Sequence, residues 1–496
     1  MRTDRRAAEV GRVRLAALAV ALALLAILPL RAAHADIAAD TEALLTRFAF
    51  PPEQVGYLLV DLETGEQVAG GRVDQGFIPA STAKVPAMVA ALGILGPDYR
   101  PRTEVLGDGL IVDGMFHGDI YLRGLGDPLL TTDGLKDLAA QLAGAGIRGI
   151  TGSFRFDPAW LPQTRLITPT QPVTAGYNPG VAALSVNFNR VHLEWTPSGP
   201  GIATAVYAYA DSGRVTVDWI DVENGGSFGA LLDYGSDDGG QESWVHADSL
   251  HGEGAVWLPV RQPAYHAAML FRAVAANAGI VLPEPIEQPT PASAYLLAVH
   301  EGETLPVLVS QIFEHSNNLA AELVGLAAAR QQAGPLASLT HGVNTTAAWL
   351  QRQVTADWAG YAMENHSGLS SQSRISPAQM CAILGYADSP DGPHIFDLLS
   401  PVRWEGNLNQ GQSGSRVQVR AKTGTMAYAV GLAGYIVAQS GRRLAFAIFV
   451  SDFAAREALD AVLDLRDAST PASARNWFNR ARELERTMVT KWAENL

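Results

Sequence analysis

The chain of 496 residues is 48% hydrophobic and 17% charged, which excludes an intrinsically disordered protein and allows two or three globular domains. Its formal net charge of −14 excludes a typical nucleic-acid-binding protein, so no nucleic-acid partner is expected. The 11 histidines include no H-E-x-x-H or comparable spacing, so no metal is expected either.

Residues 1–35 have the three parts of a secretory signal peptide. Arginines crowd the first 14 residues, residues 15–30 form an apolar run, and Ala33-His34-Ala35 is an A-x-A cleavage site. The apolar run is shorter than the roughly 20 residues that a membrane-spanning helix needs, so we favour cleavage over an anchor. We therefore expect an exported protein, periplasmic or otherwise extracytoplasmic, with no transmembrane anchor after cleavage.

The mature chain begins with helical and β patterns and then changes character. Residues 41–76 predict a helix followed by a β-hairpin that turns at Thr64-Gly65, and a helix that includes Ser81 comes next. From 101 to 292, short β-like runs alternate with Gly, Pro and Asp turns. This texture predicts a mostly β insertion with a few helices, such as one over 132–146.

Within this insertion, the acidic and glycine-rich stretch 233–243 is expected to be a loop. The pattern is helical from about 304 to 390, where the single cysteine, Cys381, lies in an apolar helical stretch that predicts a core residue. Strands return over 417–425 and in a hairpin over 431–453.

The last helix carries aromatic residues that more often cover a sheet than bind a membrane: Trp477, Phe478 and Trp492. We expect strands from both ends of the chain to form one sheet backed by the terminal helices. The chain is then an α+β, multidomain protein, in which 36–100 and 293–496 form one domain and 101–292 is inserted.

Only four lysines occur in the chain, and one lies in the motif Ser81-Thr82-Ala83-Lys84. On a helix, Ser81 Oγ and the Lys84 amine share a face. A serine hydroxyl needs a base, and a desolvated lysine with a lowered pKa can serve, whereas an arginine cannot deprotonate. The alternative is a surface serine beside a solvated lysine. Pro86 predicts a tight or kinked first turn.

A second motif, Ser316-Asn317-Asn318, stands between two helical runs. The Ser316 hydroxyl can relay a proton, and the Asn318 amide offers a donor and an acceptor to a substrate amide. The alternative is an interhelical turn with a capping Ser or Asn.

A third motif, Lys422-Thr423-Gly424-Thr425, ends a strand. The lysine can hold a substrate carboxylate, the threonine hydroxyls can add hydrogen bonds, and the glycine permits a ligand to approach the backbone closely. The alternative is an exposed edge strand with a Thr-Gly turn.

In the order S-x-x-K, S-x-N, K-T-G, the three motifs resemble those of the serine penicillin-recognising enzymes, which include penicillin-binding proteins and serine β-lactamases. The long insert between the first two motifs, from 81 to 316, resembles that of class C low-molecular-mass penicillin-binding proteins. These form the D-alanyl-D-alanine carboxypeptidase/endopeptidase family. Five segments are similar to this family: 118–130, 182–195, 316–323, 366–377 and 421–425. The sequence departs from it at Pro86 and at Glu364-Asn365-His366.

The resemblance implies a β-lactamase/transpeptidase-like core: an antiparallel sheet flanked by helices, with a helical subdomain. It also implies a serine-type D-Ala-D-Ala carboxypeptidase/endopeptidase that acts on peptidoglycan stem peptides, needs no cofactor and is inhibited by β-lactam antibiotics. Two alternatives stay open, a serine β-lactamase and a non-catalytic cell-wall-binding homologue. A related esterase or D-aminopeptidase is a further alternative.

Roles for single residues also follow from the resemblance. Ser81 would form an acyl-enzyme, Lys84 would take its proton, and Ser316 would help to pass a proton to the leaving amine. Asn318 would hold the acyl-side amide. The terminal carboxylate would bind Lys422 and Thr423, with a further contact from Thr425, and the backbone N–H groups of Ser81 and Thr425 would form the oxyanion hole.

Overall fold

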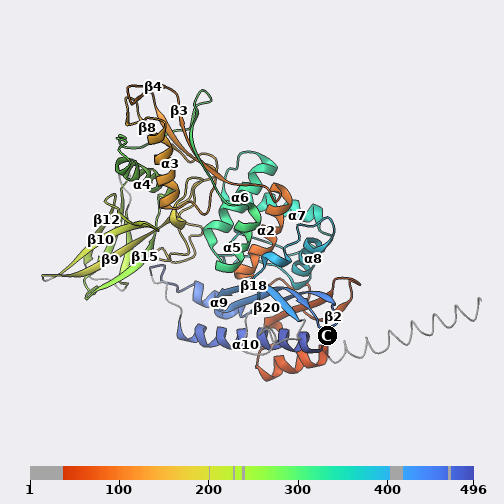
Figure 1. The fold of residues 1–496 in the computed structure, drawn as a ribbon. Coiled ribbons are helices and arrows are strands. Elements are labelled where there is room, and N and C mark those ends of the chain that lie inside the picture. The colour runs from red at the N-terminus through yellow and green to blue at the C-terminus, as the bar shows by residue number, and fades with distance from the viewer. Residues whose placement is uncertain are drawn as a thin grey trace, which may run out of the picture.

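The computed structural model describes residues 37–199, 201–226, 230–236, 241–402, 417–466 and 471–495 (Figure 1). The predicted signal peptide, 1–35, lies outside the described residues. Within these ranges, no helix combines the length and the apolar character needed to cross a membrane.

A five-stranded antiparallel sheet joins the two ends of the chain, as predicted. Its strands, in spatial order, are β18 (Gln418–Met426), β19 (Ala429–Val437), β20 (Arg443–Ser451), β1 (Val55–Asp61) and β2 (Gln67–Gly71). Both predicted hairpins form, and Gly65 and Gly441 adopt the positive φ angles that suit their turns. Strand β18, which carries the third motif, lies at an edge of the sheet.

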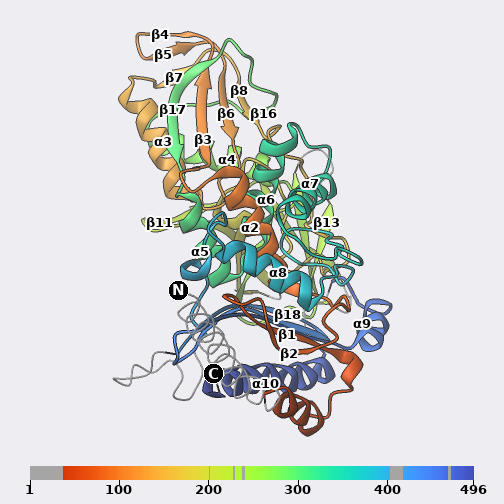
Figure 2. The same cartoon turned by 90° about the vertical axis from the view of Figure 1, so that its right-hand side faces the viewer.

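The terminal helices cover one face of this sheet (Figure 2). They are a helix over 37–47 and α10 (Ala472–Asn495). Trp477 and Trp492 of α10 are buried in the core between these helices and the sheet, and Trp492 Nε1 donates a hydrogen bond to Thr41 Oγ1 at 3.0 Å. The prediction that these tryptophans cover a sheet is confirmed.

A helical layer packs on the other face of the sheet (Figure 2). It consists of the 3₁₀ helix η2 (Ala80–Ala83), α2 (Lys84–Leu95), α5 (Leu305–His315), α6 (Asn318–Ala333), α7 (Leu339–Gln353) and α8 (Pro377–Asp388). Cys381 is buried in this core as expected, and burial raises the pKa of its thiol. Short helices outside this layer include η1 (Pro52–Gln54), η5 (Phe396–Leu398) and α9 (Phe453–Asp460).

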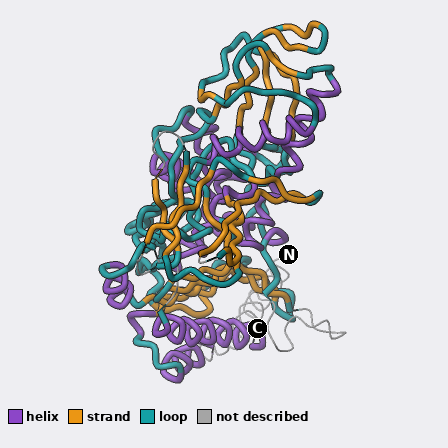
Figure 3. Tube along the Cα trace, turned by 90° about the vertical axis from the view of Figure 1, so that its left-hand side faces the viewer, coloured by secondary structure: helices purple, strands orange, loops and turns teal. Residues whose placement is uncertain are grey.

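Residues 101–292 are rich in strands, and their sheets lie on the side of the molecule away from α10 (Figure 1 and Figure 3). A mixed sheet contains β16 (Ile286–Glu287), β8 (Phe154–Asp157), β6 (Ile120–Gly124), β3 (Arg102–Gly107) and β17 (Tyr295–Glu301). A small sheet beside it contains β4 (Leu110–Val112), β5 (Met115–His117) and β7 (Gly149–Ile150). Helices α3 (Thr132–Gly144) and α4 (Pro263–Asn277) pack in the same core.

Two further sheets complete this region. One contains β11 (Gly213–Thr216), β10 (Gly201–Ala210), β9 (Arg190–Ser198) and β15 (Gly254–Pro259), and η3 (Asn187–Asn189) leads into β9. The other contains β12 (Ile220–Gly226), β14 (Glu242–Ala247) and β13 (Leu232–Ser236).

The prediction of a loop over 233–243 is wrong at both of its ends, which belong to β13 and β14. These two strands pair antiparallel, and Tyr234 packs its ring 5.4 Å from that of buried Trp244. Aromatic packing across the pair therefore outweighs the low β-propensity of Asp233 and Gly235 in β13.

The insertion contacts the helical layer through a small apolar cluster. Leu161, Ile167 and Val181 of the insertion pack there with Leu319 and Leu323 of α6. Strand β17, which follows residue 292, pairs with β3, so this sheet extends past the predicted domain boundary. The position of α6 therefore depends on the insertion as well as on the central sheet.

Trp492→Ala should lower the free energy of unfolding by about 3–5 kcal/mol, because it leaves a cavity between α10 and the sheet. Trp492 is 1% exposed. Urea denaturation followed by far-UV circular dichroism measures the loss. The matched control is Lys491→Ala, at an exposed neighbour on the same helix. Equal stabilities of the two variants would contradict this account of the core.

Candidate active site

Ser81 lies in a tight turn immediately before a helix. It belongs to the 3₁₀ helix η2, and α2 begins at Lys84, so the expectation of one continuous helix is wrong while the expectation of a tight first turn is confirmed. Pro86 is the third residue of α2, where a backbone N–H has no partner within the α-helix, so the proline is tolerated. Ala80, just before Ser81, has a left-handed φ of 45°.

Two glycines let neighbouring segments press against this turn. A Cβ on Gly424 would lie 2.5 Å from the Pro79 carbonyl oxygen, and a Cβ on Gly368 would lie 1.9 Å from the Ala80 carbonyl oxygen. Gly368 also has a φ of +77°, which strains any other residue. Glycine at these positions therefore brings strand β18 and the 366–368 segment into contact with the residues around Ser81.

The Lys84 amine lies at the centre of the site. Its Nζ donates to Ser81 Oγ at 2.9 Å, to Asn318 Oδ1 at 2.7 Å and to the Ser367 carbonyl oxygen at 2.8 Å. The side chain is completely buried. The structure thus places the lysine of the first motif against the serine of that motif and the asparagine of the second.

The surroundings of Lys84 favour its neutral form. Burial lowers the pKa of Lys84 well below its ordinary value, the charge of Lys422 lowers it further, and the carboxylate of Glu322 opposes both effects. In its neutral form the amine has two N–H donors and one lone pair, so Nζ then accepts from the Ser81 hydroxyl, as a general base must.

The second motif forms the junction of α5 and α6. Ser316 ends α5 in the left-handed conformation, and Asn317 caps α6 by accepting a hydrogen bond from the Ala320 N–H at 2.9 Å. The capping interpretation is therefore correct for Asn317. Asn318 does more, because its Nδ2 donates to the Tyr177 carbonyl oxygen at 2.9 Å while its Oδ1 faces Lys84.

The third motif lies on edge strand β18. Lys422 is 2% exposed, and burial together with the charge of Arg482 lowers its pKa to about 8. Its Nζ donates to the Thr423 carbonyl oxygen at 2.9 Å. The Thr425 hydroxyl accepts a hydrogen bond of 2.5 Å from Arg482 of α10.

A cavity of about 440 Å³ opens beside Ser81. Of the predicted site residues, four line it: Ser81, Ser316, Asn318 and Thr425. Lys84 and Lys422 are buried close behind, whereas Thr423 lines a different cavity next to α10. The remaining lining includes Gln171 and Tyr177 from the insertion, and Arg456 and Phe478 from the C-terminal part of the chain.

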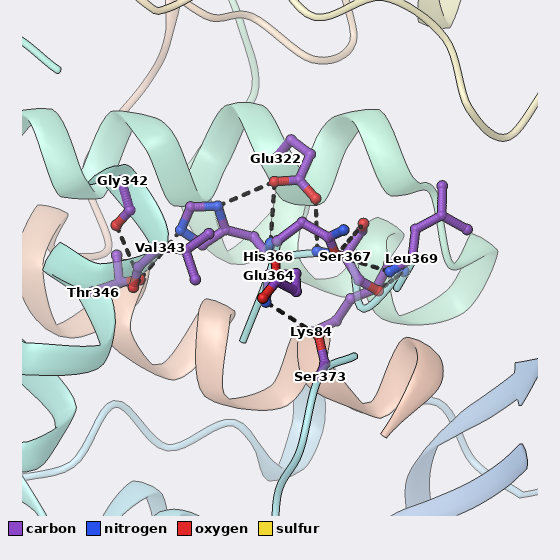
Figure 4. A network of polar contacts seen from close by, with 11 residues as sticks. Lys84, Glu322, Gly342, Val343, Thr346, Glu364, His366, Ser367, Leu369 and Ser373 are labelled. Atoms are coloured by element: carbon purple, nitrogen blue, oxygen red, sulfur yellow. Dashed lines mark hydrogen bonds and ion pairs between the residues drawn. The ribbon is translucent and has the colours of Figure 1, made fainter. Parts of the chain in front are cut away.

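A buried carboxylate that no sequence pattern indicated lies behind Lys84 (Figure 4). Glu322, on α6, is completely buried and accepts hydrogen bonds from the backbone N–H groups of His366, at 3.1 Å, and Ser367, at 2.8 Å. Its Oε2 also lies 3.2 Å from His366 Nδ1. Since the Ser367 carbonyl accepts from Lys84, Glu322 positions an acceptor of the Lys84 amine.

The His366 ring closes this network on the other side. Its Nε2 lies 3.2 Å from Thr346 Oγ1, and a Cβ on Gly325 would come within 2.4 Å of the ring, so glycine makes room for it (Figure 4). Burial alone would raise the pKa of Glu322, but its hydrogen bonds and the charge of His366 outweigh burial and lower it. The signal in the sequence was a lone Glu in an apolar run, one helical turn after Asn318.

Comparison with known proteins decides the family. The D-Ala-D-Ala carboxypeptidase 3 (S13) family matches residues 37–469. The chain belongs to this family. It is therefore a serine-type D-Ala-D-Ala carboxypeptidase, a hydrolase, as the order of the three motifs predicted.

Individual relatives support the same family assignment and the same fold. The chain is 27% identical over 441 residues to a D-alanyl-D-alanine carboxypeptidase from Actinomadura sp., covering 83% of this chain and 80% of the relative. The fold is similar to that of penicillin binding protein 4 from Haemophilus influenzae, with a TM-score of 0.69, 22% identity, and coverage of 89% of this chain and 99% of that one. A complex of the same protein with a β-lactam matches with a TM-score of 0.67, 22% identity, and coverage of 86% and 96%. The predicted α+β, penicillin-binding-protein fold is confirmed.

Glu322→Gln should destabilise the protein by roughly 3–5 kcal/mol at neutral pH, because an amide NH₂ cannot accept the backbone hydrogen bonds that the carboxylate accepts. The pKa of Glu322 is lower in the folded state than its usual value. The stabilisation is therefore complete above the unfolded-state pKa and is lost as pH falls through the folded-state pKa.

Urea denaturation from pH 7 down to about pH 2, a range that passes below the usual glutamate pKa of about 4.3, measures this effect, and the variant should lose less stability than the wild type over that range. Glu314→Gln, at an exposed position of α5, is the control. An unchanged pH dependence in Glu322→Gln would show that this carboxylate does not stabilise the site.

Proposed function

We propose that the cavity beside Ser81 is the active site, and that Ser81 attacks the D-Ala-D-Ala bond of peptidoglycan stem peptides to form an acyl-enzyme. The observation that carries this proposal is the 2.9 Å contact between Ser81 Oγ and a completely buried Lys84 amine. In this mechanism the neutral amine takes the hydroxyl proton as the oxygen attacks, and water later releases the shortened peptide.

Proton transfer to the leaving amine is assigned to Ser316, which lines the cavity together with Ser81. Asn318 is assigned to the acyl-side amide of the substrate. Its carbonyl oxygen is already held by Lys84, so its Nδ2 is the group offered to the substrate, in exchange for the Tyr177 carbonyl. Each of these groups is held by the fold before substrate arrives, which favours the transition state.

The oxyanion hole is assigned to the backbone N–H groups of Ser81 and Thr425. Support comes from the close approach of β18, since a Cβ on Gly424 would lie only 3.1 Å from Ser81 N. Removing one such donor typically costs about 2.7–4 kcal/mol of transition-state stabilisation.

The terminal carboxylate is assigned to Lys422 and Thr425, supported by Arg482, which donates to the Thr425 hydroxyl. Two cationic side chains, Lys422 on β18 and Arg482 on α10, therefore lie near one polar edge of the site. Thr423, which lines the neighbouring cavity beside α10, is assigned to the same carboxylate from the resemblance of the motif.

The wider biological setting is also part of the proposal. The signal-like residues 1–35 support export, and the β-lactam complex of the Haemophilus protein supports inhibition by β-lactams. Endopeptidase action on cross-linked stems is proposed from the resemblance of the motifs to that family. The division into a catalytic domain (36–100 and 293–496) and an insertion (101–292) remains a proposal as well.

Ser81→Ala should abolish both the release of D-alanine and the covalent adduct with benzylpenicillin, because it removes the nucleophile. Intact-protein mass spectrometry over time measures the adduct, beside the wild-type protein and a Ser440→Ala control in the β19–β20 turn. A wild-type adduct that disappears while the drug is hydrolysed would favour a β-lactamase. No wild-type adduct would overturn the assignment of Ser81.

Lys84→Arg should slow acylation by benzylpenicillin by roughly 10²–10⁴-fold, because arginine cannot give up its proton. In the wild type, the acylation rate should fall as pH is lowered through the pKa of Lys84, since only the neutral amine is a base. Stopped-flow acylation across a pH series measures both effects, with Lys136→Arg as the control. A rate that does not depend on pH would exclude Lys84 as the base.

A further inference from the structure

A second cavity, of about 480 Å³, adjoins the catalytic one. The two share Tyr177, Ser316 and Asn318 in their linings. One wall of the second cavity comes from α5 and the start of α6, and the other comes from the insertion, including Phe188 and Arg190. A substrate held by Asn318 can therefore reach both cavities.

Arg190 gives this cavity its electrostatic character. It is the one arginine or lysine of the lining, which contains no aspartate or glutamate among the described residues. Within the described residues, the guanidinium of Arg190 makes no hydrogen bond or ion pair, and its Cζ lies over aromatic faces, 5.6 Å from the Phe188 ring centroid and 5.9 Å from that of Trp257. An unpaired, half-buried guanidinium in a protein of net charge −14 favours an anionic ligand.

The backbone before Arg190 holds this side chain in place. Asn187, Phe188 and Asn189 all have left-handed φ angles, of 51°, 57° and 52°. Such a conformation costs about 1–3 kcal/mol per residue and needs support from its surroundings. Asn187 Nδ2 donates to Thr132 Oγ1 at 2.7 Å, and Asn189 Nδ2 donates to the Gly180 carbonyl at 2.8 Å.

The aliphatic part of the Arg190 side chain packs close to residues of the proposed active site. A Cβ on Gly176 would lie 3.4 Å from Arg190 Cδ, so the glycine leaves room for the arginine. The next residue, Tyr177, accepts the hydrogen bond from Asn318 Nδ2 at 2.9 Å. Arg190 therefore packs against Gly176, the neighbour of Tyr177. The Tyr177 carbonyl in turn holds the Asn318 amide that is proposed to bind the acyl-side amide of the substrate.

We infer that this second cavity is a substrate subsite in which Arg190 binds a carboxylate on the acyl side of the scissile bond. A planar guanidinium pairs with a carboxylate through two parallel hydrogen bonds, which gives both affinity and orientation. A stem peptide carries such a group as the free carboxylate of its glutamyl residue. The inference rests on the proposed function and names the part of the substrate that the enzyme selects.

The test uses two synthetic peptides, L-Ala-γ-D-Glu-L-Lys-D-Ala-D-Ala and the same peptide with the glutamyl carboxylate converted to a carboxamide. The wild type should hydrolyse the acid with a kcat/KM about tenfold higher than the amide, as expected for one hydrogen bond to a charged group. In Arg190→Gln this ratio should fall towards one, and Arg190→Lys should retain part of it. Arg352→Gln, at an exposed site on α7, should keep the wild-type ratio.

Equal kcat/KM values for the two peptides in the wild type, or an unchanged ratio in Arg190→Gln, would overturn the inference. Far-UV circular dichroism and the penicillin adduct establish that each variant is folded. If the wild type releases D-alanine from neither peptide, the proposed function fails. The charge preference is then still decided by calorimetric binding of both peptides to Ser81→Ala.

Discussion

The buried amine of Lys84 is the interaction on which the rest of the site depends. It brings together three parts of the chain, because its hydrogen-bond partners are Ser81 in η2, Asn318 in α6 and the carbonyl of Ser367. A buried ammonium costs several kcal/mol. The fold lowers that cost with oxygen acceptors and by favouring the neutral amine, and the neutral amine is also the form that can activate a serine.

The position of this amine depends in turn on a second buried charge. Glu322 fixes the backbone at His366 and Ser367, and its carboxylate partly offsets the desolvation of Lys84. A stronger negative charge nearer the amine would keep it protonated and inactive as a base. The Ser367 peptide unit separates the Glu322 carboxylate from the Lys84 amine. The carboxylate can therefore hold the Ser367 carbonyl in place as an acceptor, while the surroundings of the amine still favour its neutral form.

Residues 101–292 contribute to the candidate site as well as to the size of the molecule. Their apolar contact with α6 supports the second motif, and the Tyr177 carbonyl holds the side chain of Asn318. The insertion also provides the strained turn that presents Arg190 beside that asparagine. Strain of this kind persists only where surrounding hydrogen bonds enforce it, so the geometry of this wall is determined by the insertion.

The sequence by itself determined the motif residues, the family and the joining of terminal strands in one sheet, because these depend on residue type, order and local periodicity. It could not reveal Glu322, Tyr177 or Arg482, because a single buried or exposed polar residue has no periodic signature. Only the tertiary structure decided these points, since burial, charge and contacts between residues more than 200 positions apart depend on how the chain packs.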